Sequence, residues 1–314
     1  MDGIVLTIGK FESVHLGHQT LIAEVKRQAQ SAKRVSAVMV FEPYPYVIFG
    51  ATDYRPLFSD AERIQLLHEF GVERVIVQPF DKTFAELSPE KFCEEIFREL
   101  NAKVVVVGED YRFGFKREGT IALLQSQAAV FGTKVEVVSS AFLADGCTAV
   151  STSLIRDLLI ANKLAEAQQL LGFPFFMTGV TAKGRQLGQK LGFPTLNLYP
   201  NENEKFLLVD GVYATRTIIE GVMYTSVTNI GLRPTVSNDN KIRSVETHLL
   251  DSINAKRNCS IPREMNFGEL YEKSIKVEFL QFIRGEKKFA SLDELKNQIA
   301  KDTTVAEKIH KKNR

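Results

Sequence analysis

The first half of the chain alternates short apolar runs with segments in which apolar residues recur at helical spacing. The apolar runs are continuous and rich in valine, as is typical of strands buried on both faces. They span residues 3–8, 35–41, 74–78, 103–107 and 134–138, and the helical segments span residues 18–29, 59–70, 88–100 and 120–131. Ser59 with Glu62, and Ser88 with Pro89, are helix-start signals. This alternation predicts an α/β fold with a doubly wound parallel sheet.

The pattern changes at about residue 173. Strand-like segments at residues 176–182, 211–219, 222–230, 244–250 and 274–282 follow one another without helices between them. Partial alternation of apolar and polar positions predicts an antiparallel β-barrel. The spacing of Ser291 and Glu294 predicts a capping box that opens a C-terminal helix to about His310. We therefore expect an α/β domain over residues 1–173 and a barrel domain over residues 174–314, with a long loop at 254–269.

Composition narrows the class of protein. A chain of 314 residues is long enough for two hydrophobic cores. The net charge of +2 gives no field that favours nucleic acid or a membrane surface as a partner. Three cysteines at unrelated spacings fit a reducing compartment better than a disulfide framework. Because no apolar run reaches the length of a membrane span, we expect a cytoplasmic protein.

Two histidines lie where the first predicted strand leads into the first predicted helix. His15 and His18 flank Gly17 in the run Gly9-Lys-Phe-Glu-Ser-Val-His-Leu-Gly-His18. Backbone N–H groups at a helix start bind phosphate, and Gly17 lets a phosphate approach the main chain closely. The two imidazoles can donate hydrogen bonds to phosphoryl oxygens. The run therefore indicates a nucleoside triphosphate site at the carboxyl edge of the sheet.

Simpler interpretations of this turn exist. A histidine can cap a helix without binding a ligand, and two histidines three residues apart can be zinc ligands. Zinc needs a third and a fourth ligand, whereas the other histidines and the cysteines are scattered without ligand spacing. Capping stays open as an alternative, and zinc is disfavoured.

Five further runs lie where predicted strands end or helices begin. They are Phe41-Glu-Pro-Tyr-Pro45, Gly108-Glu-Asp-Tyr-Arg-Phe-Gly114, Val150-Ser-Thr-Ser-Leu-Ile-Arg156, Leu191-Gly-Phe-Pro-Thr-Leu-Asn197 and Val245-Glu-Thr-His248. Taken in order with the histidine run, they resemble the bifunctional bacterial riboflavin kinase/FAD synthetase family, from about residue 5 to about residue 302. The resemblance implies that the C-terminal half transfers the γ-phosphoryl group of ATP to riboflavin, giving FMN. The N-terminal half would adenylylate FMN with a second ATP, giving FAD and pyrophosphate.

For adenylyl transfer, the resemblance implies that His15 and His18 bind the ATP phosphates and stabilise the charged transition state. The residues of the same run that would line the nucleotide site are Gly9, Phe11 and Gly17.

Two more regions would serve this reaction. Ser151, Thr152 and Ser153 match the family's phosphate motif at a helix N-terminus, and Arg156 would neutralise the leaving pyrophosphate. Arg112 would meet FMN or the nucleotide. Without the resemblance, helix capping explains the three hydroxyl residues, and a surface ion pair with a neighbouring carboxylate explains Arg112.

For the kinase reaction, Thr195 and Asn197 match the family's Pro-Thr-x-Asn motif, which implies that they hold Mg²⁺ together with phosphate oxygens. Glu246 matches the family's base, which would accept the proton of the riboflavin hydroxyl or orient that hydroxyl. The other residues that the resemblance assigns to ATP or flavin binding are Gly184, Gly188, Lys190 and Arg233.

The chain departs from the family pattern at several positions. Glu12-Ser13 stands where aspartate-glycine is usual, and Ser13 would be strained if that position has a positive φ. Tyr44 replaces a usual histidine or glutamine, Gln189 a usual arginine, and Gly285 a usual proline. None of these is a residue to which we assign chemistry.

The expected function is a bifunctional enzyme with ATP, riboflavin and FMN as small-molecule substrates. The alternatives are a protein with one of the two activities, another cytidylyl- or adenylyltransferase, and a non-catalytic flavin-binding module. The Pro-Thr-x-Asn run and Glu246 argue against another nucleotidyltransferase. The presence of His18, Arg156 and Asn197 besides Glu246 argues against a non-catalytic module. The sequence leaves oligomerisation open.

Overall fold

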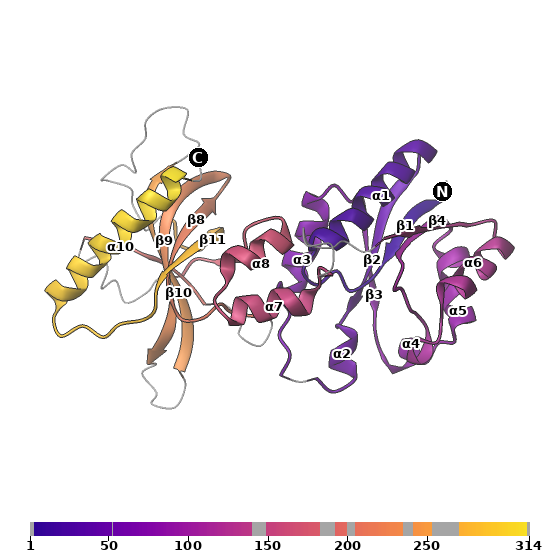
Figure 1. The fold of residues 1–314 in the computed structure, drawn as a ribbon, viewed down its shortest axis with the longest axis horizontal. Coiled ribbons are helices and arrows are strands. Elements are labelled where there is room, and N and C mark those ends of the chain that lie inside the picture. Colours follow the sequence, from indigo (N-terminus) through magenta and orange to yellow (C-terminus); the bar gives the residue numbers. More distant parts are fainter. Residues whose placement is uncertain are drawn as a thin grey trace. The chain divides into compact units, whose positions relative to one another are not determined.

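The computed structural model describes residues 3–51, 53–139, 149–182, 192–199, 205–234, 241–252 and 270–312. Contacts divide the chain into two compact units, Met1–Leu154 and Ile155–Arg314. Each unit has its own sheet (Figure 1) and is described by itself. The predicted change from an α/β pattern to a β pattern is confirmed. The expected limits of the two functional domains, 1–173 and 174–314, stay a prediction.

The first unit contains a five-stranded parallel sheet with the strand order β3-β2-β1-β4-β5. The strands are β1 (Ile4–Ile8), β2 (Val35–Glu42), β3 (Arg74–Pro79), β4 (Ala102–Gly108) and β5 (Lys134–Val138). The chain runs outward from β1 to β2 and β3, and then returns to the other side of β1 with β4. The switch point therefore lies at β1 and β4, and the histidine turn that follows β1 falls there, as expected.

Helices cover both faces of this sheet (Figure 1). The helical segments of this unit are α1 (Leu16–Ala32), α2 (Pro45–Ile48), α3 (Asp60–Glu69), α4 (Lys82–Ala85), α5 (Pro89–Glu94), the π-helical turn η1 (Glu95–Glu99), the 3-10 turn η2 (Phe115–Arg117) and α6 (Ile121–Val130). On one face, Val25 and Ala29 of α1 pack against Val5 of β1. Because neighbouring strand residues point to opposite faces, Ile4 and Leu6 face the other layer.

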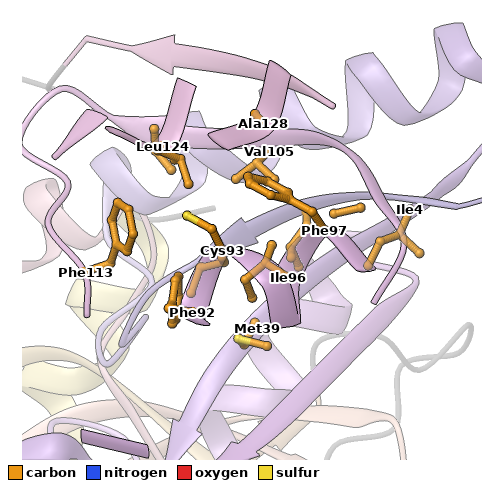
Figure 2. Close-up of a cluster of buried hydrophobic side chains, with 14 of the residues drawn as sticks. Ile4, Met39, Phe92, Cys93, Ile96, Phe97, Val105, Phe113, Leu124 and Ala128 are labelled. Atoms are coloured by element: carbon orange, nitrogen blue, oxygen red, sulfur yellow. The ribbon is translucent and has the colours of Figure 1, made fainter. Parts of the chain in front are cut away.

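That other layer holds the larger core, which Figure 2 shows in close-up. Phe92 of α5 and Phe97 of η1 belong to this cluster, together with Met39 of β2 and Leu124 of α6. All four side chains are at most 4% exposed. This packed layer fixes the sheet, so that the ends of its strands can position a site.

The helix predictions hold with two differences. The capping box of Ser59 and Glu62 forms at the start of α3, and Ser88 caps α5 ahead of Pro89. The segment expected as one helix over 88–100 contains the π-helical turn η1, which no spacing signal in the sequence marks. The four-residue helices α2 and α4 were not predicted, because one turn is too short to show a period.

The second unit contains a six-stranded antiparallel sheet with the order β6-β11-β8-β9-β10-β7. The strands are β6 (Phe176–Val180), β7 (Leu196–Leu198), β8 (Gly211–Ile219), β9 (Val222–Pro234), β10 (Lys241–Ser252) and β11 (Ser274–Arg284). Five of them match predicted strands. β7 has three residues and was not predicted. The loop expected at 254–269 lies outside the described residues.

The two edges of this sheet meet and nearly close a barrel, which confirms the predicted fold class. Ala182, just after β6, forms an antiparallel bridge with Asn197 of β7, and its N–H donates to the Asn197 carbonyl at 2.8 Å. Gly179 allows the approach, because a Cβ there would lie 2.6 Å from Leu198 Cδ2. We call this bridge, with the Gly179–Leu198 contact, the seam of the barrel.

Helices α7 (Thr152–Ile160), α8 (Leu164–Leu171) and α10 (Leu292–Lys312) complete the chain. Ala306 and Ile309 of α10 pack on Val212, Ala214 and Val227, which lie on the outer face of the barrel. The opposite face of β8 and β11 carries Tyr213 and Phe279, whose rings meet edge to face inside the barrel.

The start of α10 differs from the expected capping box. Ser291 accepts a hydrogen bond from the Glu294 N–H at 3.1 Å, but the Glu294 carboxylate accepts from the Ala290 N–H instead of the Ser291 N–H. Only the serine half of the box is therefore present. Within the described ranges, no helix has the length and apolar composition that crossing a membrane requires.

Candidate active sites

The first candidate site is built on the turn between β1 and α1. His15 is the N-cap of α1, and its Nδ1 accepts a hydrogen bond from the His18 N–H at 3.3 Å. The capping interpretation is thus correct for His15. The two imidazole rings are stacked, with centroids 3.8 Å apart, and the ring of Phe11 lies 4.7 Å from that of His18. The structure therefore brings together three side chains that the sequence placed at the nucleotide site.

Burial keeps both imidazoles neutral near pH 7. It lowers the pKa of His15 to about 4, although a backbone hydrogen bond offsets part of the shift. Burial, aided by the charges of His15 and Lys10, lowers the pKa of His18 well below its ordinary value. The Nδ1 atom of His18 is buried without a hydrogen-bond partner among the described residues. A buried polar atom without a partner costs free energy, which an incoming acceptor or donor would recover.

The expected strain at Ser13 is absent. Positive φ angles occur at Phe11 (46°) and Val14 (44°), but not at Ser13. The Ser13 hydroxyl instead lies 2.8 Å from the Thr152 hydroxyl, 139 positions away in the chain. The departure from the family's glycine therefore ties the histidine turn to the start of α7. Thr152 belongs to the predicted phosphate motif, so two predicted phosphate-binding runs meet.

Two buried charged side chains, Glu12 and Arg63, form hydrogen bonds that stabilise the same turn. Glu12 is 2% exposed and accepts hydrogen bonds from the Tyr54 hydroxyl at 2.9 Å and from the Leu57 N–H at 3.2 Å. The fully buried Arg63 donates to the Lys10 carbonyl at 3.0 Å. Sequence reasoning missed these supports, because charged residues in a helix or a loop ordinarily face solvent.

Tyr44, the departure in the second run, is also buried. Its ring lies 4.3 Å from the Arg63 guanidinium and stacks on the ring of Tyr46. Burial raises its pKa well above the usual value, which keeps the phenol neutral. At this position, where the family usually has histidine or glutamine, the ring of Tyr44 therefore packs on the buried Arg63 side chain.

The remaining residues predicted for adenylyl transfer are less closely grouped. Ser151 accepts from the Leu154 N–H at 3.2 Å, which is a helix-capping contact, and Ser153 is exposed. Arg112 is exposed and donates to the Tyr111 carbonyl. Arg156 lies in the second unit, where its guanidinium is 5.3 Å from the Phe206 ring. Gly17 lies in the first turn of α1, and Gly9 donates its N–H to the Met39 carbonyl.

The second candidate site is a row of polar residues across three strands of the barrel. Glu246 of β10 pairs in register with Asn197 of β7 on one side and with Asn229 of β9 on the other. Paired residues in an antiparallel sheet lie on the same face, about 5 Å apart. This is the outer face, because Asn229 also pairs with Val212, which α10 covers. The predicted metal ligand and the predicted base are therefore neighbours.

The segment before Asn197 is held by a histidine. His248 Nδ1 lies 2.8 Å from the Pro194 carbonyl, and its ring meets Phe193 edge to face. Burial lowers the pKa of His248, so the neutral ring donates this bond. Thr195 follows Pro194 directly and comes just before β7, two residues from Asn197. Oxygen atoms of Thr195 and Asn197 beside a carboxylate suit a hard divalent cation.

Four predicted binding residues cannot be located in this site. Gly184, Gly188 and Lys190 lie outside the described residues. Arg233 belongs to β9, and its side chain is not described. Within the described ranges there is no group of three or more histidine, cysteine, aspartate or glutamate side chains that could hold a metal ion.

Family comparisons cover both units. Residues 1–153 match the family described as FAD synthetase, and residues 171–310 match the family described as riboflavin kinase. The chain is 36% identical over 309 residues to the bifunctional riboflavin kinase/FMN adenylyltransferase of Escherichia coli, covering 97% of this chain and 92% of that protein. Its identity to the Haemophilus influenzae protein of the same name is 35% over 310 residues, covering 98% and 94%.

A solved structure shares the whole fold. The crystal structure titled as a macrolide-efflux protein from Streptococcus pneumoniae superposes with a TM-score of 0.81 at 26% identity, covering 97% of this chain and 94% of that one. The parallel α/β sheet and the barrel thus occur together elsewhere. On the family matches and the near full-length identity, this chain belongs to the bifunctional riboflavin kinase/FMN adenylyltransferase family.

Proposed function

We propose that the two activities of this riboflavin kinase and FMN adenylyltransferase reside in separate halves of the chain. Adenylylation of FMN to FAD is assigned to residues 1–173, and phosphorylation of riboflavin to FMN is assigned to residues 174–314. The observation that supports this division is the match of two different families to two different parts of the chain. Each part contains a separate cluster of polar side chains.

In the adenylyl transfer, His15 and His18 bind the phosphates of ATP. Both rings are neutral at pH 7, so each can donate a hydrogen bond to a phosphoryl oxygen without placing a charge in a buried site. Negative charge develops on these oxygens as the FMN phosphate attacks the α-phosphorus, and fixed donors stabilise it. The unpartnered His18 Nδ1 supports this role. Gly9, Phe11 and Gly17 line the nucleotide site.

The start of α7 contributes to the same reaction. The helix N-terminus favours negative charge, and Ser151, Thr152 and Ser153 add hydroxyl donors. Thr152 already contacts the histidine turn through Ser13. Arg156, four residues further along the helix, neutralises the leaving pyrophosphate, and Arg112 meets the incoming flavin or nucleotide.

In the kinase reaction, Glu246 accepts the proton of the riboflavin hydroxyl as that oxygen attacks the γ-phosphorus of ATP. Asn197 and Thr195 would hold Mg²⁺, which would offset the negative charge of the ATP phosphates. The pairing of Asn197 with Glu246 supports this assignment, because attacking group and phosphate must be held in line. Gly184, Gly188, Lys190 and Arg233 are assigned to the walls of the ATP and flavin sites.

The assay that tests this proposal supplies riboflavin, ATP and Mg²⁺ and separates the flavins. FAD is the expected product, and removal of Mg²⁺ by a chelator is expected to stop its formation. FMN alone would mean that only the kinase half is active. FAD from added FMN but none from riboflavin would mean that only the N-terminal half is active. We expect the protein to act in the cytoplasm. Its expected partners are small-molecule substrates, and neither nucleic acid nor a membrane is expected as a partner.

A further inference from the structure

A second carboxylate lies beside Glu246, outside the set of residues assigned to the kinase reaction. Glu286 follows β11, and its carboxylate rests on Gly231 of β9. The Glu286 Cδ atom is 2.9 Å from the position that a Cβ on Gly231 would occupy, and the Asn229 Nδ2 atom is 3.3 Å from the same position. A side chain at residue 231 would therefore collide with Glu286. Glycine within a strand interior is otherwise unfavourable, so its presence suits this close approach.

The strand register places this carboxylate next to the kinase row. Gly231 pairs with Ser244, and Asn229 pairs with Glu246, so the two pairs are neighbours on the same outer face. Two residues along a strand span about 7 Å. Glu286 is therefore displaced from Glu246 by about 7 Å along the strands, a distance that a chain of a few carbon atoms can span.

Ser244 gives an independent sign that this place receives a ligand. Its side chain is 1% exposed, and its Oγ has no hydrogen-bond partner among the described residues. By strand alternation it points to the same face as Glu246. Buried hydroxyl groups are nearly always hydrogen-bonded in folded proteins. A hydroxyl left without a partner beside Gly231 is therefore consistent with a site that a ligand completes.

The charges define what the ligand must be. Glu286 is exposed, and it makes no hydrogen bond or ion pair with the described residues. The two nearby arginines have other carboxylate partners: Arg243 pairs with Asp210, and Arg284 pairs with Asp302 at 2.7 Å. With Glu246 close by, two carboxylates of this surface can accept hydrogen bonds, so the surface attracts hydroxyl donors.

We propose that Glu286, with Asn229 and Ser244, binds the hydroxyl groups of the ribityl chain whose terminal hydroxyl is presented to Glu246. This inference rests on the proposed kinase function. Glu286 accepts hydrogen bonds from the chain, the Asn229 amide donates or accepts, and the Ser244 hydroxyl gains its missing partner. The subsite selects a polyol chain and sets how far the flavin enters. Glu286 is here a binding and specificity residue, and the proton transfer stays with Glu246.

The test compares the full-length chain with its Glu286→Gln variant, with Glu307→Gln on the exposed side of α10 as the matched control. Loss of a hydrogen bond to a charged group predicts a rise in the riboflavin KM of about tenfold or more, with kcat and the ATP KM nearly unchanged. Lumiflavin has the ring system but no ribityl chain, so its affinity should be equal in both proteins. Glu307→Gln should leave every value unchanged.

A second variant tests the contact itself. Gly231→Ala adds a Cβ that displaces the Glu286 carboxylate, so it should raise the riboflavin KM in the same way. The double variant should lose no more than Gly231→Ala alone, because both changes remove one interaction.

Three outcomes would overturn the proposal. An equal loss of lumiflavin affinity would mean that Glu286 acts on the ring site or on the fold. A rise in the ATP KM in place of the riboflavin KM would assign the carboxylate to the nucleotide ribose. An unchanged riboflavin KM in Glu286→Gln would remove the subsite. If the wild-type chain binds riboflavin without phosphorylating it, the kinase function fails, and the riboflavin and lumiflavin dissociation constants decide on the subsite.

Discussion

The two candidate sites are built from different kinds of local structure. In the first unit, the polar groups lie on one turn and at the starts of two helices, α1 and α7, where backbone N–H groups point outward. In the second unit, the polar groups lie in a row across β7, β10 and β9. The backbone of these residues takes part in strand pairing, so only the side chains face a ligand. One candidate site thus lies at the ends of strands and helices, and the other lies within strands.

This difference explains the chemistry that each site suits. Helix starts provide many weak donors, which match a phosphate chain with charge on several oxygens. A strand row provides few groups at fixed spacing, which matches one hydroxyl that must face one phosphorus. The comparison predicts that changes in the barrel row affect one step alone, while changes in the turn affect phosphate binding and folding together.

The largest effect is expected for Glu246→Gln. Without a base, riboflavin phosphorylation should fall by about 10²–10⁴-fold, because general base catalysis contributes that much. FMN-to-FAD conversion should remain, since Glu246 lies in the other unit. Separate assays with riboflavin and with FMN measure the two steps. Loss of both steps in a folded variant would contradict the division of activities, and Glu307→Gln is the control.

His18→Ala should produce the opposite pattern. Removing one donor to a charged transition state costs about 10²–10³-fold in rate, so FAD formation from FMN should nearly stop. FMN formation from riboflavin should continue at the wild-type rate. His68, which lies at the end of α3 and bonds the Val72 carbonyl, offers a control histidine in the same unit. Equal losses for His18→Ala and His68→Ala would mean that the effect is one of stability.

The pH dependence of folding should be traceable to the histidine turn. The folded pKa of His15 is about 4 and the unfolded value is 6.5, so between these values the unfolded chain binds a proton that the folded chain does not. Stability should therefore fall as the pH is lowered from 6.5 toward 4, by about 3 kcal/mol from this residue. In His15→Gln, the difference between thermal unfolding at pH 7.5 and at pH 4.5 should be smaller. An unchanged difference would show that His15 is not buried as a neutral ring.

The smallest effect is expected for Ser13→Ala. It removes the hydrogen bond to Thr152 and should cost about 1 kcal/mol of stability, measured by thermal unfolding. Ser126→Ala, in which an exposed hydroxyl on α6 loses a bond to its own helix, serves as the control. A Ser13→Ala variant as stable as the wild type would mean that the turn and α7 are held together by other contacts.

Much of the first site could be predicted from the sequence because its parts are local. The strand, the turn and the helix start follow one another within residues 4–18, and hydrophobic spacing marks each of them. What could not be predicted is the contact of Ser13 with Thr152, because nothing in either run encodes the distance between them. The positive φ angles at Phe11 and Val14 were missed for a related reason, since neither residue type signals that conformation.

The second site was predictable only as separate motifs. The resemblance identified Asn197 and Glu246, but hydrophobic spacing gave no strand at residues 196–198 and so no register between them. Strand register depends on partners far along the chain, and a shift of one residue would move Glu246 to the other face. The contact between Glu286 and Gly231 could not be predicted, because these residues lie 55 positions apart and only the assembled barrel brings them together.

The seam between Ala182 and Asn197 has a wider consequence. The main chain of Asn197 closes the barrel, while its side chain belongs to the row that we assign to the metal. In the proposed kinase site, opening the last strand pair would also displace the metal ligand Asn197, so any occupant of the row would lower the population of opened molecules. Saturating the kinase half with its substrates should slow hydrogen exchange at the Ala182 amide, a backbone group to which no step of the reaction is assigned.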